Sequence, residues 1–144
     1  MSKYKFKFKD KEYELNKSNC SGVINDEDKS VTNIDLDEVL RLLNETQDVD
    51  FDLEYYQEAC PECLSGVKEK QKFFGFLEYH FYLFTKNGEY VISDISKDYE
   101  GLSFNKLSRD GKVDDSYIVS IIMCESCSDY IVQIENCIVK KMLL

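Results

Sequence analysis

Four of the six cysteines stand in two C-x-x-C pairs that lie far apart in the chain. The first pair, CPEC, places thiols at Cys60 and Cys63, and the second, CESC, places them at Cys124 and Cys127. Each pair holds two thiolates on one tight turn, and two such turns brought together supply the four-sulfur tetrahedron that zinc prefers. The spacing therefore predicts a metal site with these four cysteines as its ligands.

Two paired turns favour a closed, structural zinc site, because no coordination position stays open for a substrate. A thiol redox site is one alternative, although a thioredoxin-like C-x-x-C opens a helix that lowers its thiol pKa, whereas Ser65, Gly66 and strand-like sequence follow Cys63. An iron–sulfur cluster is the other alternative, since four cysteines also suit it. Cys20 and Cys137 have no C-x-x-C neighbour, and we expect them to be buried or idle thiols.

The segment 60–66, in which a glycine permits a sharp turn after the second cysteine, resembles a zinc-ribbon knuckle, and residues 123–130 resemble its partner. The resemblance implies paired knuckles, each at the tip of a two-strand hairpin. Residues 64–123 separate the cysteine pairs, an interval longer than in a small ribbon, and an inserted β-hairpin unit over residues 67–115 would account for it. The whole chain is similar to a small bacterial protein family of unknown function, a resemblance that implies no activity.

The composition describes one ordered, acidic domain over residues 1–144. Hydrophobic residues make up 43% of the chain, with 9 Phe and 10 Tyr, and aromatic side chains favour strands. The net charge of -10 argues against binding to nucleic acid or to an anionic membrane, because both need clustered lysine and arginine. No stretch resembles a signal peptide or a membrane span, so we expect a cytoplasmic protein, with its thiols kept reduced.

The first fifteen residues alternate between apolar and charged side chains, which predicts a β-hairpin. With Asp10 and Lys11 as the turn, Lys9 would face Glu12 and Phe8 would face Tyr13. The polar segment 16–31 that follows is expected to be a surface loop.

Residues 33–46 are predicted to form the one helix of the chain. Asp35 can serve as its N-cap, with Glu38 three residues later and Ile34 and Val39 as a hydrophobic staple. The helical spacing of its leucines predicts one apolar face that packs on a sheet.

Strict alternation returns between residues 48 and 55 and predicts a half-buried strand. Its outer face carries four carboxylates in a row, and its inner face is apolar. Because the lysines of the N-terminal hairpin already face glutamates, we expect this acidic row to be exposed and hypothesise that it meets a basic protein partner. The row comprises Asp48, Asp50, Asp52 and Glu54.

Further strands are expected over residues 73–84, 89–95, 102–107, 117–123 and 130–139, with Asn87-Gly88 as a hairpin turn. The fold class that follows is α+β and β-rich: an antiparallel sheet built from hairpins, with one packed helix and a zinc-ribbon-like four-cysteine site.

The sequence favours a binding module over an enzyme. His80 is the only histidine, so an acid–base or nucleophilic site would depend on it, and a hydrogen-bonded strand histidine is the simpler interpretation. We therefore expect an acidic adaptor with a structural zinc ion. The alternative is a small enzyme or thiol redox protein that uses Cys60 and Cys63 with a pocket near His80.

Overall fold

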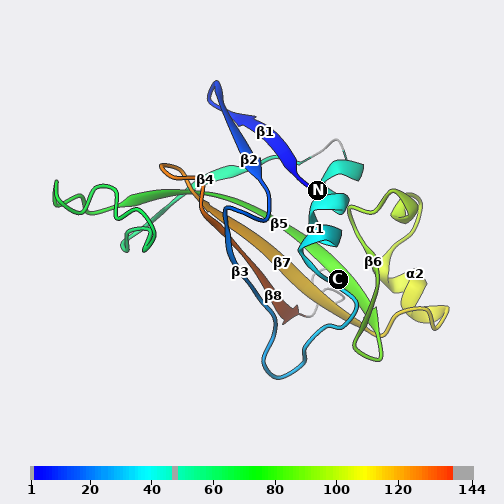
Figure 1. The fold of residues 1–144 in the computed structure, drawn as a ribbon. Helices are drawn as coiled ribbons and strands as arrows, with labels where there is room; N and C mark the ends of the chain where they lie inside the picture. The colour runs from blue at the N-terminus through cyan, green and yellow to red at the C-terminus, as the bar shows by residue number, and fades with distance from the viewer. Residues whose placement is uncertain (1, 47–48, 138–144) are drawn as a thin grey trace.

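The computed structural model describes residues 2–46 and 49–137 and shows a β-rich fold with hairpins and one main helix (Figure 1). Four cysteines lie together in one cluster. No helix in these two ranges is long and apolar enough to cross a membrane. The elements are β1 (Tyr4–Phe8), β2 (Lys11–Leu15), β3 (Cys20–Ile24), α1 (Leu36–Glu45), β4 (Asp52–Tyr56), β5 (Phe74–Lys86), β6 (Glu89–Ser93), the 3-10 helix η1 (Lys97–Tyr99), α2 (Phe104–Arg109), β7 (Asp115–Cys124) and β8 (Tyr130–Cys137).

Six strands form one sheet, in the order β3-β8-β7-β5-β4, with β6 pairing to the far end of β5. All neighbours are antiparallel except β3 and β8, which are parallel. The long central pair is β5 and β7, whose register runs from Phe76 opposite Cys124 to Thr85 opposite Asp115. The strands β1 and β2 form a separate hairpin.

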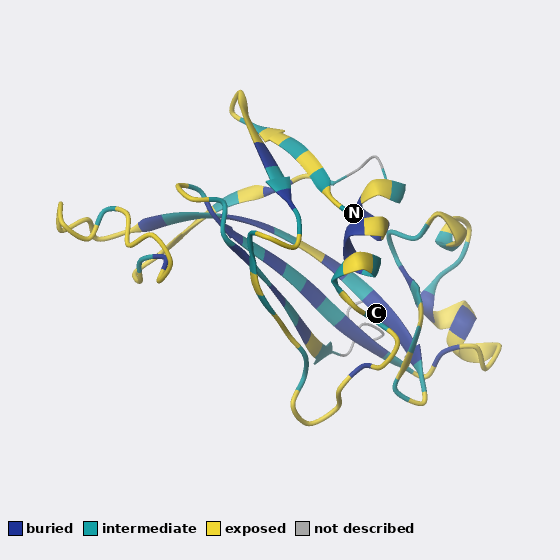
Figure 2. Ribbon diagram, in the orientation of Figure 1, coloured by how far each residue is buried: buried dark blue, intermediate teal, exposed yellow. Residues whose placement is uncertain are grey.

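The main core lies between one face of the sheet and a layer made by α1 and the β1–β2 hairpin. Along β5 and β7, alternate residues such as Leu77, Phe81 and Ile121 are buried on this face, as strand periodicity requires (Figure 2). The helix contributes four fully buried side chains: Val39, Leu40, Leu42 and Leu43.

The predicted helix is confirmed, together with its start signal. Asp35 has an extended backbone, and its carboxylate accepts a hydrogen bond from the amide of Glu38 at 2.8 Å. The Glu38 carboxylate accepts from Arg41 and from the hydroxyl of Tyr90 on β6, so the first turn is tied to the sheet. These hydrogen bonds, with Arg41 the larger cause, lower the pKa of Glu38 despite its partial burial.

The N-terminal hairpin forms as predicted, but its turn lies one residue earlier. Lys9 and Asp10 both have positive φ angles, of 48° and 67°, which is the conformation of a two-residue type I′ turn. The register therefore shifts by two residues, and Lys7 lies opposite Glu12 while Lys5 lies opposite Glu14. Lysines still face glutamates because a shift of two preserves the faces.

Three elements were not predicted: the short 3-10 helix η1, strand β3 and helix α2. The polar segment 16–31, expected to be a loop, contains β3, which gains its stability by parallel pairing with β8 rather than from any alternation of its own. The segment 102–107, expected to be a strand, instead begins helix α2, because the Ser103 side chain accepts from the amide of Lys106 as an N-cap.

The acidic strand is shorter than predicted, since β4 begins at Asp52. The outer face is as expected, since Asp50, Asp52 and Glu54 are exposed. On the inner face Phe51 is buried, but Tyr55, also expected there, is 64% exposed. Asp48 lies outside the described residues. The carboxylate row therefore continues from the strand into the segment that precedes it.

Replacing Asp35 by alanine should destabilise the protein by about 1 kcal/mol, because the Glu38 amide loses its only cap acceptor at the helix start. Urea unfolding measures this change. Asp37→Ala is the matched control, since it removes a carboxylate from the same turn without removing the cap. Equal losses in the two variants would show that the helix start depends on charge and not on the cap.

Candidate functional site

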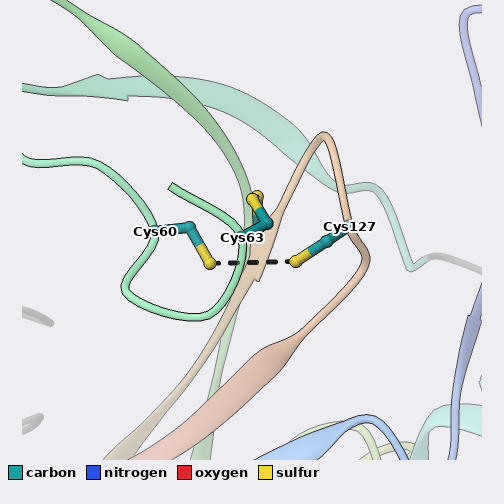
Figure 3. Close-up of side chains that lie close together, drawn as sticks. Cys60, Cys63 and Cys127 are labelled. Atoms are coloured by element: carbon teal, nitrogen blue, oxygen red, sulfur yellow. Dashed lines mark hydrogen bonds between the residues drawn. The ribbon is translucent and has the colours of Figure 1, made fainter. Parts of the chain in front are cut away.

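The two cysteine turns lie at the same end of the sheet, at the tips of two neighbouring hairpins (Figures 1 and 3). One turn lies in the connection between β4 and β5 and carries Cys60 and Cys63. The other joins β7 to β8 and carries Cys124 and Cys127. Because β5 pairs with β7, the pairing of Phe76 with Cys124 brings the two tips together.

The two turns share the same backbone geometry. In each turn, the residue after the second cysteine has a positive φ angle, 50° at Leu64 and 68° at Ser128. The amide of that residue donates to the carbonyl of the first cysteine, at 2.9 Å for Leu64 to Cys60 and 3.0 Å for Ser128 to Cys124. The sharp reversal after the second cysteine thus occurs at these two residues. The sequence predicted the sharp turn at Gly66, which also has a positive φ angle, of 89°.

The four sulfur atoms form one compact group. The Sγ atoms of Cys60 and Cys127 are 3.8 Å apart, those of Cys63 and Cys124 are also 3.8 Å apart, and all four lie within 4.8 Å of one another. A tetrahedron with Zn–S bonds of about 2.3 Å has edges of about 3.8 Å. The side chains are therefore spaced to hold a single metal ion, and the structure brings together all four predicted ligands.

The electrostatics of the cluster explain why it needs a cation. Burial raises the pKa of the Cys124 and Cys127 thiols, because it removes solvent from a charged sulfur. A hydrogen bond from the Ser65 amide lowers the pKa of Cys63. The turns therefore stabilise one thiolate by themselves, whereas a full set of four needs a bound positive ion.

The second turn is anchored to the rest of the molecule through Glu125. Its amide donates to the Gly75 carbonyl at 3.2 Å, and its own carbonyl accepts from the Lys11 ammonium at 3.3 Å. A side chain at Gly75 would collide with the Glu125 carboxylate, since an added Cβ would lie 2.6 Å from Oε1. A side chain at Gly75 would therefore displace the flexible Glu125 side chain.

Cys20 and Cys137 lie outside the cluster. The Cys20 thiol is partly buried at the start of β3 and contacts the Gly22 carbonyl at 3.5 Å. Cys137 lies at the end of β8, with Sγ 3.8 Å from the Ser116 hydroxyl. Burial raises the pKa of both thiols. Their surroundings are those of packed side chains.

The acidic row leads directly toward the first turn, because β4 ends at Tyr56 and Cys60 follows four residues later. None of the ion pairs between described residues uses Asp50, Asp52 or Glu54. The nearest lysine row is otherwise engaged, since Lys5 lies 3.8–3.9 Å from Glu12 and Glu14. These three carboxylates therefore face solvent.

A chain of polar side chains crosses the opposite face of the sheet, and sequence patterns did not reveal it. The Ser120 hydroxyl lies 2.8 Å from His80 Nδ1, and His80 Nε2 lies 3.2 Å from a carboxylate oxygen of Glu78. Glu78 is only 7% exposed, and its second oxygen, Oε2, is buried without a hydrogen-bond partner. Pairing of β5 with β7 creates this arrangement, because His80 lies directly opposite Ser120.

The geometry does not join this chain to the cysteines. His80 lies four positions along β5 from Phe76, the residue opposite Cys124. This spacing corresponds to about 13 Å of extended strand. A cavity of about 730 Å³ lies at the N-terminal hairpin among Lys3, Glu14 and Asp37. The predicted alternative, a thiol site with a pocket at His80, therefore finds no support in these distances.

A β-rich sheet clamped at one end by a four-cysteine cluster defines this molecule as a small domain with a candidate metal centre. The chain belongs to the family described as a protein of unknown function (DUF3785), whose model matches residues 4–139. No curated protein and no solved structure matches the chain.

Glu78→Gln should be more stable than the parent protein. The difference in the free energy of unfolding should grow as the pH rises above 4.5, the ordinary pKa of glutamic acid. Burial raises the pKa of Glu78, the partner His80 opposes that shift, and Glu54 adds to it. The folded parent therefore holds a proton that the unfolded chain releases, so its stability falls with rising pH through this window.

Chemical unfolding of both proteins across this pH range measures the difference. Glu135→Gln, which changes an exposed carboxylate on the same face, is the matched control and should show no such trend. A difference between Glu78→Gln and the parent that stays constant with pH would contradict the raised pKa.

Proposed function

We propose that the chain is an acidic protein-binding adaptor module whose fold is completed by one structural zinc ion. The observation that supports the metal is the pair of 3.8 Å sulfur–sulfur separations, which equals the edge expected of a zinc tetrathiolate. An iron–sulfur cluster would insert several iron atoms between the same thiolates and hold them farther apart. The four side chains therefore suit a single ion better.

The burial pattern supports a structural role for that ion. One cysteine of each turn is buried, with Cys60 and Cys124 at 5% and 4% exposed, whereas Cys63 and Cys127 lie at the surface; four protein ligands leave no open coordination position. When bound, the ion neutralises the thiolates and cross-links two hairpins. Its apparent binding energy, about 10–16 kcal/mol in zinc-finger peptides, is comparable to the whole stability of a domain.

Protein purified without chelator should carry about one zinc ion per chain, and Cys124→Ser should lose both the metal and most of the folding stability. Elemental analysis and thermal unfolding measure the two effects. Cys20→Ser is the matched control, because Cys20 lies outside the cluster; it should keep the zinc and lose no more than about 1 kcal/mol. Metal-free parent protein, or equal melting temperatures for the two variants, would contradict a structural site.

The adaptor role rests on the exposed acidic row. Asp50, Asp52 and Glu54 lie on one side of the edge segment that leads to the metal, without a cation in the described part of the chain to neutralise them. A basic partner should bind this acidic row most tightly at low salt, since exposed charges are screened beyond about 10 Å at 0.1 M. We include Asp48 in the proposed partner site from its place in the sequence alone.

Changing Asp50, Asp52 and Glu54 together to the matching amides should abolish capture of basic proteins and leave zinc content and unfolding unchanged. The measurement is affinity capture from native cytosol, with the recovered proteins ranked by isoelectric point, in parallel with and without chelator. Amide replacement of Asp98, Glu100 and Asp110, which are exposed near the opposite end of the sheet, is the control with the same change in charge. Equal capture by both variants would show that only total charge matters.

A further inference from the structure

The second face of the sheet, which we call the open face, carries a band of apolar side chains beside the polar chain of Ser120, His80 and Glu78. Residues that pair across strands share a face, so Phe76 on β5, Ile118 and Ile122 on β7, and Ile131 on β8 all point to this side. Ile24 on β3 and Tyr56 on β4 extend it to both edges, at 52% and 40% exposed, and the Tyr56 ring packs edge-on against Phe76 at 5.2 Å.

Among the described residues, the chain covers only one end of this face. Helix α2 packs Phe104 and Leu107 onto Phe84, with Tyr82 and Cys137 at the margin of that small cluster. The isoleucines at the middle belong neither to this cluster nor to the main core. Along β7 they form the partly exposed bands that alternate with buried residues (Figure 2).

This pattern is unusual for a solvent-facing sheet surface. An antiparallel sheet with one wet face shows polar residues at the outward positions, whereas here an apolar band crosses five strands diagonally and comprises Tyr56, Phe76, Ile122, Ile131 and Ile24. A contiguous apolar patch bounded by polar groups marks a surface that another molecule covers.

The charges on the open face are all negative. Asp52 and Glu54 lie at one edge and Glu135 at the other, and Glu78 stands near the centre, with one buried carboxylate oxygen that has no partner. No lysine or arginine stands at the open-face positions of β4, β7 or β8, or of β5 between Phe74 and Phe84. In a dimer formed through this face, the carboxylates of the two copies would lie close to one another, and their repulsion would cost free energy.

We propose that the open face docks a basic amphipathic helix of a partner protein, whose apolar side packs on the isoleucines and whose lysines or arginines reach the flanking carboxylates. This inference rests on the proposed adaptor role and assigns that role a surface and a partner class. The chain already covers both faces of its sheet with helices, α1 on one and α2 at the end of the other, so the partner would complete the same packing.

The test uses the zinc-loaded full chain and a synthetic amphipathic peptide with leucines on one helical face and lysines on the others. We expect saturable binding, with slowed amide exchange in β7 and β8. The double variant Ile122→Thr, Ile131→Thr keeps strand-favouring residues and should weaken binding about tenfold or more. Val23→Thr, on the opposite face of β3, is the matched control and should bind normally.

A peptide with glutamate in place of lysine separates the contributions. We expect it to bind about tenfold or more weakly; equal binding of the two peptides would overturn the basic character of the partner. If the lysine peptide bound the threonine variant as tightly as the parent, open-face docking would be overturned. The adaptor role would still stand in that case if the variant with amides at Asp50, Asp52 and Glu54 lost binding. A concentration-dependent dimer that the threonine variant abolishes would instead assign the face to a second copy.

Discussion

Four thiolates within 4.8 Å of one another cannot all be charged unless a cation lies among them, and this constraint governs one whole end of the molecule. Burial already disfavours the charged form of Cys124 and Cys127, so a full set of four thiolates requires a compensating cation. A single ion would resolve the conflict and would also join the β4–β5 hairpin to the β7–β8 hairpin, since each hairpin supplies two of the four cysteines. The register of the central β5–β7 pair brings the two tips together and thereby makes that possible.

The apolar core does not reach this end, where our proposal places the ion. Helix α1 and the N-terminal hairpin cover the sheet over its middle, whereas the connection that carries the first cysteine pair leaves Leu64, Val67 and Phe73 between 48% and 57% exposed (Figures 1 and 2). Hydrophobic burial therefore contributes little to the position of that connection. The contacts that hold it are turn hydrogen bonds and, in our proposal, four metal–sulfur bonds. Metal sites take this role where a core is insufficient.

Local signals in the sequence were enough to predict the features that depend on local chemistry. The cysteine spacing, the cap at Asp35 and the Asn87-Gly88 turn each act within a few residues, and the structure contains all three. Features that depend on distant partners were not predictable. Strand β3 has weak propensity and exists because β8 offers it an edge, and the Ser120–His80–Glu78 chain exists because two strands pair in one register. The helical start at Ser103 was a local signal that the apolar residues after it obscured.

The same strands that carry the metal ligands carry the open face, and this connects the two parts of the proposed function. Phe76 on β5 lies directly opposite Cys124 on β7. Ile122 precedes Cys124 by two residues on the same strand, and Ile131 is the second residue of β8. Separation of the two hairpin tips would therefore disturb the pairing that holds Phe76, Ile122 and Ile131 on a common face. The acidic residues of β4 are subject to the same coupling, since their strand leads into the first cysteine pair. In our proposal, a structural metal at this position therefore fixes the geometry of the open face as well.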